Sequence, residues 1–113
     1  MSHTIAYSDF EKVDVRVGRI LEAKAFEKAR KPAYQLRIDF GPALGVKKSS
    51  AQITDLYTPE TLAGRLVLAV VNFPPRQIAD FMSEVLVLGV PDAEGRIVLL
   101  QPERDAPLGA RMY

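Results

Sequence analysis

Alternation of apolar and polar side chains marks the first two strands predicted for this chain. Residues 13–17 read Val-Asp-Val-Arg-Val, which is the period of a half-buried strand, and the pattern continues to residue 25. Residues 34–40 repeat that period, with tyrosine, leucine, isoleucine and phenylalanine at alternate positions on one face. Gly18 interrupts the first strand, and because glycine lacks a Cβ we predict a bulge or sharp bend there.

Capping and turn residues divide the rest of the chain. Thr58 as N-cap, Pro59 at the first helical position and Gly64 at the end predict a short helix. The run from Ser8 to Glu11 has the form of a capping box and predicts a helical turn near the N-terminus. Further strands are expected at residues 46–54, 66–71, 85–90 and 96–100.

This order of elements predicts an all-β fold. Three strands, a short helix and a closing hairpin are the order of a five-stranded OB-fold Greek-key barrel, whose open face and loops bind extended ligands. The short helix lies between strands three and four, and the barrel carries a short N-terminal helical turn and a C-terminal extension. The 113 residues fit a single domain spanning residues 1–113. We expect the tail, residues 101–113, to wrap the surface or a partner.

The composition argues against catalysis. The chain has no cysteine, so a thiolate nucleophile and a cysteine-ligated metal are impossible. Its one histidine, His3, lies in a terminus and is a poor candidate for a positioned base. Neither a GxGxxG sequence nor a Walker loop is present. We therefore predict a binding protein that is not an enzyme and uses no metal and no cofactor.

The sequence contains neither a predicted membrane span nor a predicted signal peptide. The longest apolar run, residues 66–71, is far shorter than the ~20 residues of a membrane span, and Met1 to Ala6 does not resemble a signal peptide. We therefore expect a cytoplasmic protein with no membrane insertion.

Basic residues are concentrated in one part of the sequence. Residues 16–48 hold nine basic and three acidic residues, in a chain of net charge +1. This split predicts either one basic face or charges scattered over a solvated surface.

Four sequence blocks resemble the tRNA-binding-domain family. They are Val-Asp-Val-Arg-Val-Gly-Arg-Ile-Leu-Glu at residues 13–22, Leu-Arg-Ile-Asp-Phe-Gly at 36–41, Val-Val-Asn-Phe at 70–73 and Ser83-Glu84. The loop at residues 27–34, the polar segment 46–54 and Val85-Leu86 after Ser-Glu are similar to the stand-alone CsaA branch of that family. This resemblance implies a homodimeric OB-fold protein that is a chaperone-like, export-related peptide binder, with tRNA binding as in the wider family.

Two groups of basic and polar residues are candidates for ligand binding. In the first, Lys28, Arg30 and Lys31 form a basic loop that either contacts phosphates, attracts acidic segments or serves only solubility. In the second, strand three is unusually polar, which suits either an exposed binding strand or an edge strand protected by lysines. Its candidates are Lys47, Lys48, Ser50 and Gln52.

The remaining candidates follow the buried strand at residues 66–71. Phe73 either stacks on a base or holds an apolar client residue, with Arg76 in the same loop. Asn72 either contacts the ligand or ties down the turn through backbone hydrogen bonds. Ser83 and Glu84 either bind ligand or stabilise their own loop.

Two functions remain open from the sequence. The first is a homodimeric, chaperone-like protein that binds unfolded or presecretory polypeptides, with the export machinery as a further partner. In this case extended peptides supply apolar side chains and backbone hydrogen bonds to an exposed strand. The alternative is a tRNA-binding protein in which the paired basic patches of the dimer hold RNA by shape and backbone charge.

Overall fold

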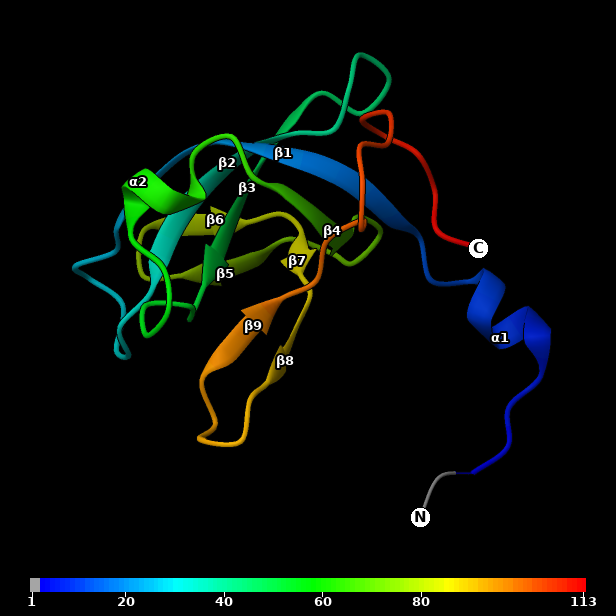
Figure 1. The fold of residues 1–113 in the computed structure, drawn as a ribbon, viewed down its shortest axis with the longest axis horizontal. Helices are drawn as coiled ribbons and strands as arrows, with labels where there is room; N and C mark the ends of the chain where they lie inside the picture. Colours follow the sequence, from blue (N-terminus) through cyan, green and yellow to red (C-terminus); the bar gives the residue numbers. More distant parts are fainter. Residues whose placement is uncertain (1–2) are drawn as a thin grey trace.

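A computed structural model describes residues 3–113 and shows a small β-barrel with extensions at both ends (Figure 1). Two short helices accompany nine strands along the described chain. In chain order the elements are α1 (Tyr7–Glu11), β1 (Val15–Ala25), β2 (Tyr34–Asp39), β3 (Val46–Ala51), α2 (Pro59–Leu62), β4 (Leu66–Val70), β5 (Arg76–Ile78), β6 (Phe81–Ser83), β7 (Leu86–Val87), β8 (Gly89–Pro91) and β9 (Ile97–Leu99).

The barrel is one antiparallel sheet in the order β3-β2-β1-β4-β7. Strand β1 is long enough to serve two neighbours, because Val15 to Arg19 pair with β4 and Arg19 to Ala25 pair with β2. A strand shared in this way must coil, so the sheet curls until β6 and β7 approach β3. The predicted all-β OB-fold barrel is confirmed.

The core consists of the alternate residues that the sequence pattern places inside. Leu36, Ile38 and Phe40 of the second predicted strand are at most 1% exposed. Val67 and Ala69 of β4 are fully buried against them. Helix α2 covers one end of the barrel with Leu62, and Thr58 caps it by accepting a hydrogen bond of 3.3 Å from the Thr61 N–H, as predicted.

The prediction for Gly18 is wrong in its mechanism. Strand β1 runs through Gly18 without a break, and the irregularity in its pairing lies between Ile20 and Glu22. A Cβ at Gly18 would stand 2.6 Å from Ile38 Cγ2 and 2.7 Å from Phe40 Cε1. The glycine is therefore required by the close approach of two core side chains and not by a bend.

Other element boundaries also differ from the prediction. Residues 85–90 do not form one strand, because β7 ends at Val87 and β8 belongs to a separate hairpin with β9. The third strand ends at Ala51. Helix α1 begins one residue before Ser8 with Ala6 as its N-cap, and the Asp9 carboxylate, in the role predicted for Glu11, accepts from the Ala6 N–H at 3.1 Å. The hairpin of β5 and β6 was not predicted, because its strands are too short to show a period.

The C-terminal tail lies along the start of β1. The backbone N–H of Val17 donates to Ala110, and the N–H groups of Gly109 and Met112 donate to Val17 and Val15. Tail residues 109–112 thus extend the sheet beside β1, and Tyr113 ends fully exposed. Among residues 3–113, no helix is long and apolar enough to cross a bilayer.

Candidate ligand-binding site

The β5–β6 hairpin and the residues after it close the barrel against β3. The Ser50 N–H donates to Ser83 Oγ at 3.0 Å, and the Lys48 N–H donates to Glu84 Oε1 at 2.9 Å. In return, the Glu84 N–H donates to the Lys48 carbonyl at 2.8 Å. Ser83 and Glu84 therefore satisfy the outer backbone groups of β3. That strand is not the free binding edge that its polarity suggested.

The polar residues of β3 divide between the two faces of the strand. Ser49 is fully buried and donates to the carbonyl of Val85, the residue before β7, at 3.0 Å, which ties β3 to that segment from inside the barrel. Lys47 lies opposite Ile38, on the same side as Ser49, whereas Lys48 lies opposite Arg37 on the outer side. The two lysines therefore do not act on one surface.

A small apolar pocket of about 290 Å³ opens beside this closure. It lies between the turn after β4 and the start of β7, and its polar margin consists of Ser50, Arg76, Ser83 and Glu84. Its apolar lining consists of Phe73, Pro74, Ile78, Val85 and Leu86. The Phe73 side chain is 52% exposed and Leu86 is 49% exposed, so the lining remains open to solvent. Such a surface accepts an apolar group from a ligand.

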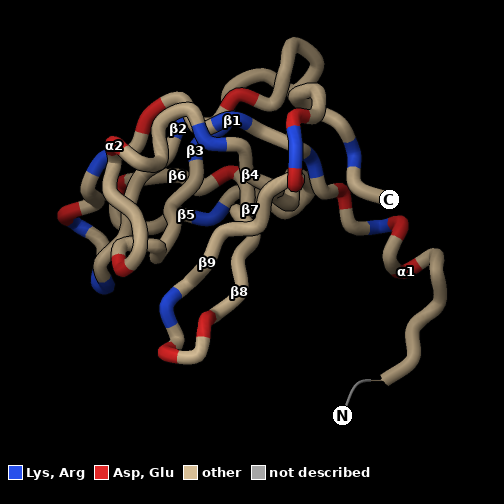
Figure 2. The backbone as a smooth tube through the Cα atoms, viewed as in Figure 1, with Lys and Arg blue, Asp and Glu red and all other residues tan. Residues whose placement is uncertain are grey.

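A second pocket, of about 590 Å³, adjoins the first and shares Ser50, Arg76 and Ile78 with it. It lies between the β1–β2 loop and the β5–β6 hairpin, and Gln52 lines it from the end of β3. Figure 2 shows the basic residues that gather in the β1–β2 loop at the left of the barrel. Four cationic side chains line this cationic pocket and no carboxylate does, the cations being Lys28, Arg30, Lys31 and Arg76.

An ion pair links the two walls of the cationic pocket. Lys28 Nζ lies 2.8 Å from Asp80 Oδ2 at the tip of the β5–β6 hairpin. The hydrogen bond and charge of Lys28 lower the pKa of Asp80, and Asp80 raises the pKa of Lys28 in the same way. Both groups are exposed, so the pair positions the loop more than it stabilises the fold. Arg30, Lys31 and Arg76 make no ion pair within residues 3–113.

Phe81 anchors the β5–β6 hairpin to the barrel. Its ring packs against Phe26 with 5.4 Å between ring centroids, and Lys48 Nζ lies 5.3 Å from the Phe81 centroid. These contacts hold β6 against the end of β1 and the middle of β3. Lys48 therefore supports the hairpin, through its backbone and its ammonium group, and lies outside both pockets.

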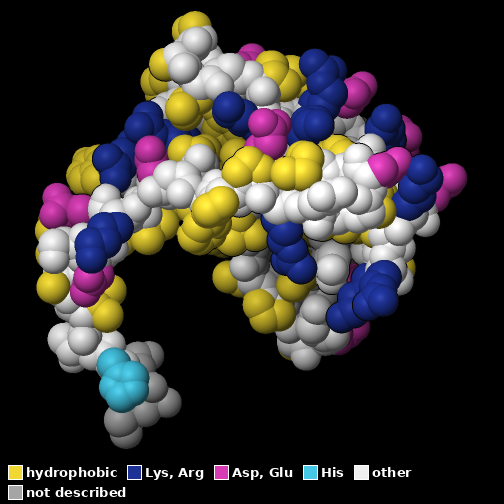
Figure 3. Space-filling view, turned by 180° about the vertical axis from the view of Figure 1, so that it is seen from behind, with side chains coloured by type: hydrophobic (Ala, Val, Ile, Leu, Met, Phe, Trp, Pro, Cys, Tyr) yellow, Lys and Arg dark blue, Asp and Glu magenta, His cyan; other side chains and the backbone are white. Residues whose placement is uncertain are grey.

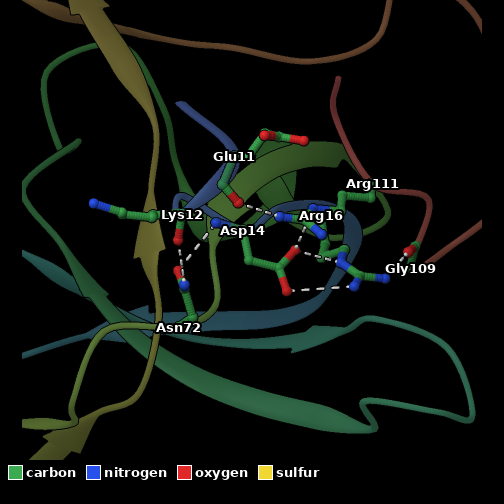
Figure 4. Close-up of polar contacts among 7 residues, drawn as sticks. All are labelled: Glu11, Lys12, Asp14, Arg16, Asn72, Gly109 and Arg111. Carbon is green, nitrogen blue, oxygen red and sulfur yellow. Dashed lines mark hydrogen bonds and ion pairs between the residues drawn. The ribbon is translucent and has the colours of Figure 1, made fainter. Parts of the chain in front are cut away.

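Asn72 lies just after the C-terminal end of β4, in a cluster of polar contacts with the segment that precedes β1 (Figure 4). Its Oδ1 accepts from the Asp14 N–H at 3.1 Å, and its Nδ2 donates to the Lys12 carbonyl at 2.7 Å. The Asp14 carboxylate in turn pairs with Arg16 and Arg111. Asn72 thus ties the segment after α1 to the barrel. It fastens residues far away in the sequence and not its own turn.

The nine basic residues between positions 16 and 48 do not form one face. Arg16 bonds to Asp14, Arg19 donates to the Gly64 carbonyl, and Arg37 pairs with Glu22. Arg76, which lies outside that segment, lines the same pocket as the basic loop.

Ile78, Val85 and Leu86 line the apolar pocket but were not predicted from the sequence. The apolar pair Val85-Leu86 after Ser83-Glu84 was the signal that could have indicated two of them. Residues 3–113 contain no cluster of side chains that could hold a metal ion.

Comparison with known proteins identifies the family. Residues 15–111 match the family described as "Putative tRNA binding domain". The solved structure of chaperone CsaA from Bacillus anthracis is 51% identical, covers 98% of this chain and all of its own, and superposes with a TM-score of 0.91. This chain belongs to the tRNA-binding-domain family, in its CsaA branch.

Two further relatives show the breadth of the tRNA-binding-domain family. The CsaA chaperone protein of Picrophilus torridus is 50% identical, covers 97% of this chain and all of its own, and has a TM-score of 0.91. The methionine–tRNA ligase of Flavobacterium johnsoniae is 36% identical over 94% of this chain. The chain spans only 14% of that ligase. The family description names RNA binding and no catalytic activity.

Proposed function

We propose that this protein is a CsaA-type, chaperone-like binder of unfolded or presecretory polypeptides, acting in the cytoplasm and connected with protein export. One observation carries the proposal. The apolar pocket around Phe73 and Leu86 is open to solvent and directly adjoins the cationic pocket. The similarity of nearly the whole chain to two solved CsaA chaperones also supports the proposal. The site binds and releases a client and catalyses no reaction on it.

The chemistry of the two pockets suits a client with little sequence specificity. Apolar side chains supply affinity that depends on contact area and not on one exact shape. The margin of flexible basic side chains attracts acidic groups from many directions. A holding protein needs this combination, because tight and specific binding would prevent release of the client before it folds.

We further propose that the protein is a homodimer. The N-terminal segment projects from the barrel as an arm, and hydrophobic side chains border the hollow beside it (Figure 3). A cleft of about 600 Å³ between α1 and the tail is lined by Tyr7, Phe10, Val13, Met112 and Tyr113, among others. The Tyr7 side chain is 68% exposed and Tyr113 is fully exposed. A second copy of the chain would cover these aromatic side chains.

The second candidate function is tRNA binding. The observation that favours it is the cluster of Arg30, Lys31 and Arg76, three cations without an ion-pair partner in residues 3–113. Cations of this kind bind phosphates without reading sequence. The exposed Phe73 ring offers a stacking surface for one base. In a dimer, two such clusters would hold the RNA backbone.

A salt titration separates the two functions. Binding of an unfolded polypeptide and of tRNA should be measured on the same preparation at rising salt concentrations. RNA held through several phosphates loses affinity steeply with salt, whereas apolar peptide capture holds or strengthens. The proposal expects salt-tolerant polypeptide binding. Binding of tRNA alone, with a steep salt dependence, would favour the second function.

A further inference from the structure

Strand β5 has a partner on one side only. Its residues Arg76, Gln77 and Ile78 pair with Ser83, Met82 and Phe81 of β6, and no other strand of residues 3–113 pairs with it. On the far side of β6 lies β3, whose outer N–H groups are already bonded to Ser83 and Glu84. The free backbone edge in this part of the barrel is therefore that of β5.

The geometry of the hairpin determines which residue offers that edge. Ala79 and Asp80 form the turn, so Ile78 and Phe81 are the hydrogen-bonded pair that flanks it. Hydrogen-bonded and non-bonded pairs alternate along an antiparallel ladder, which makes Gln77 and Met82 a non-bonded pair. The backbone N–H and C=O of Gln77 consequently point away from β6, toward the outer edge.

That outer edge lines the cationic pocket. Residues 76–79 form one wall of the pocket, and residues 28–31 of the β1–β2 loop form the wall opposite. The ion pair between Lys28 and Asp80 joins the two walls at the hairpin tip. Lys28 is paired with Asp80, but Arg30, Lys31 and Arg76 face this space with no ion-pair partner in residues 3–113, so an occupant that carries negative charge is complementary to it.

The apolar pocket lies on one face of the same strand. Arg76 and Ile78 point to that face, because alternate residues of a strand share a side, and both line the apolar pocket. An extended polypeptide laid along the β5 edge also alternates its side chains. Its residues would therefore reach the apolar pocket and the basic loop in turn.

We propose that the free edge of β5 receives an extended client segment as an added strand, through the backbone of Gln77. The basic loop then favours segments in which acidic residues alternate with apolar ones. This inference rests on the proposed function as a polypeptide binder and specifies its contact strand and its preferred client chemistry. β-Strand addition supplies affinity through main-chain hydrogen bonds and leaves specificity to the pockets for alternate side chains.

The first test compares two variants at Gln77. Gln77→Pro removes the backbone N–H that would bond to the client, and it leaves the ladder to β6 complete because that N–H faces outward. Gln77→Ala is the matched control, since it removes the side chain and keeps the N–H. The probe is a synthetic decapeptide of alternating leucine and glutamate. Both variants lose the Gln77 side chain and its hydrogen bond to the Ala79 carbonyl, so we expect Gln77→Pro to bind the peptide about tenfold more weakly than Gln77→Ala.

The second test leaves the protein unchanged and so does not depend on the folding of a proline variant. The same peptide is prepared with N-methyl groups on its leucines or on its glutamates, because alternate residues of a strand bond to opposite edges. One series should lose about tenfold more affinity than the other. A peptide with lysine in place of glutamate should bind more weakly than the acidic peptide at low salt.

The outcomes distinguish the two levels of proposal. If the acidic peptide binds, but Gln77→Pro matches Gln77→Ala or both N-methylated series lose equally, the assignment to the β5 edge is wrong. Preference for the lysine peptide would overturn the client chemistry. If the parent protein binds neither peptide but binds a single-stranded RNA oligonucleotide, the polypeptide-binding function is wrong as well.

Discussion

Glu84 and Lys48 hold each other through two hydrogen bonds. The Glu84 N–H donates to the Lys48 carbonyl at 2.8 Å, and the Lys48 N–H donates to the Glu84 carboxylate at 2.9 Å. The side chain of Glu84 thus replaces the backbone acceptor that a neighbouring strand would have supplied to β3. Together with Ser83, it closes the barrel at the point where the sheet lacks a complete partner strand.

Replacing Glu84 should therefore weaken the fold before it weakens ligand binding. We expect Glu84→Ala to lower the free energy of unfolding by about 1–2 kcal/mol, because the Lys48 N–H loses its charged acceptor. Glu84→Gln keeps a carbonyl oxygen at the same position and should lose less. Urea unfolding of both variants measures the difference. Unchanged stability with reduced peptide affinity would make Glu84 a ligand-binding residue instead.

Asn72 should behave as a structural tie as well. Asn72→Ala removes its hydrogen bonds to the Asp14 N–H and the Lys12 carbonyl, and we expect a loss of about 1 kcal/mol. Amide hydrogen exchange at Asp14 should accelerate, while affinity for the peptide probe stays as in the parent. Asn72→Asp retains the acceptor for the Asp14 N–H but sets a carboxylate oxygen against the Lys12 carbonyl, so it should keep the slow exchange at Asp14 while still losing stability.

Gly18 provides a test of close packing in the core. Gly18→Ala places a methyl group within 3 Å of Ile38 and Phe40, and overpacking of this kind costs ~1–3 kcal/mol. The urea midpoint should fall accordingly. A shorter side chain in Phe40→Leu should relieve part of that cost, so the double variant should lose less than the sum of the two single variants. Strict additivity would contradict the proposed contact.

The basic loop should be separable from the fold. Changing Lys28, Arg30 and Lys31 together to Ser removes three exposed charges, and each such change alters stability by less than ~0.5 kcal/mol. Affinity for the acidic peptide should fall, and affinity for an uncharged apolar peptide should survive. If RNA is the ligand, the log–log salt slope should flatten by about 0.7 per lost contact on single strands.

A charge-matched variant controls for the loss of net charge in that experiment. Changing Lys12, Lys24 and Arg104 to Ser removes the same three charges from exposed positions outside both pockets. This control should leave peptide affinity and the RNA salt slope as in the parent. Equal effects of the two triple variants would show that only net charge matters, and a basic-loop variant that unfolds would make the loop structural.

The proposed homodimer has a direct measurement. Light scattering at micromolar concentration should report a mass twice the 12.5 kDa of one chain. Tyr7→Asp places a charge in the exposed cleft between α1 and the tail, where it would be buried on association, and should shift the mass toward the monomer. Tyr7→Phe is the control and should remain dimeric. A monomer mass for the parent protein would contradict the proposal.

Much of the barrel was predictable from local patterns. The alternation at residues 34–40 correctly separated core from surface, and the apolar run that became β4 was correctly recognised as a buried strand. The cap at Thr58 correctly placed α2. These features depend on neighbours in the sequence, through side-chain period and backbone capping, so a single chain displays them. The β5–β6 hairpin did not show itself, because three-residue strands are shorter than any recognisable period.

The candidate site depended on contacts that no local pattern contains. The sequence identified the loop at residues 28–31, Phe73 and Arg76 as separate candidates, and closure of the barrel places them around two adjoining pockets. The same closure brings the Ser83 and Glu84 side chains to the edge of β3, where they accept hydrogen bonds from its backbone N–H groups. Folding thereby leaves β5 as the free edge. Whether a polar group faces a ligand or a distant backbone N–H is decided by which strands meet, and that follows from the curl of the whole sheet.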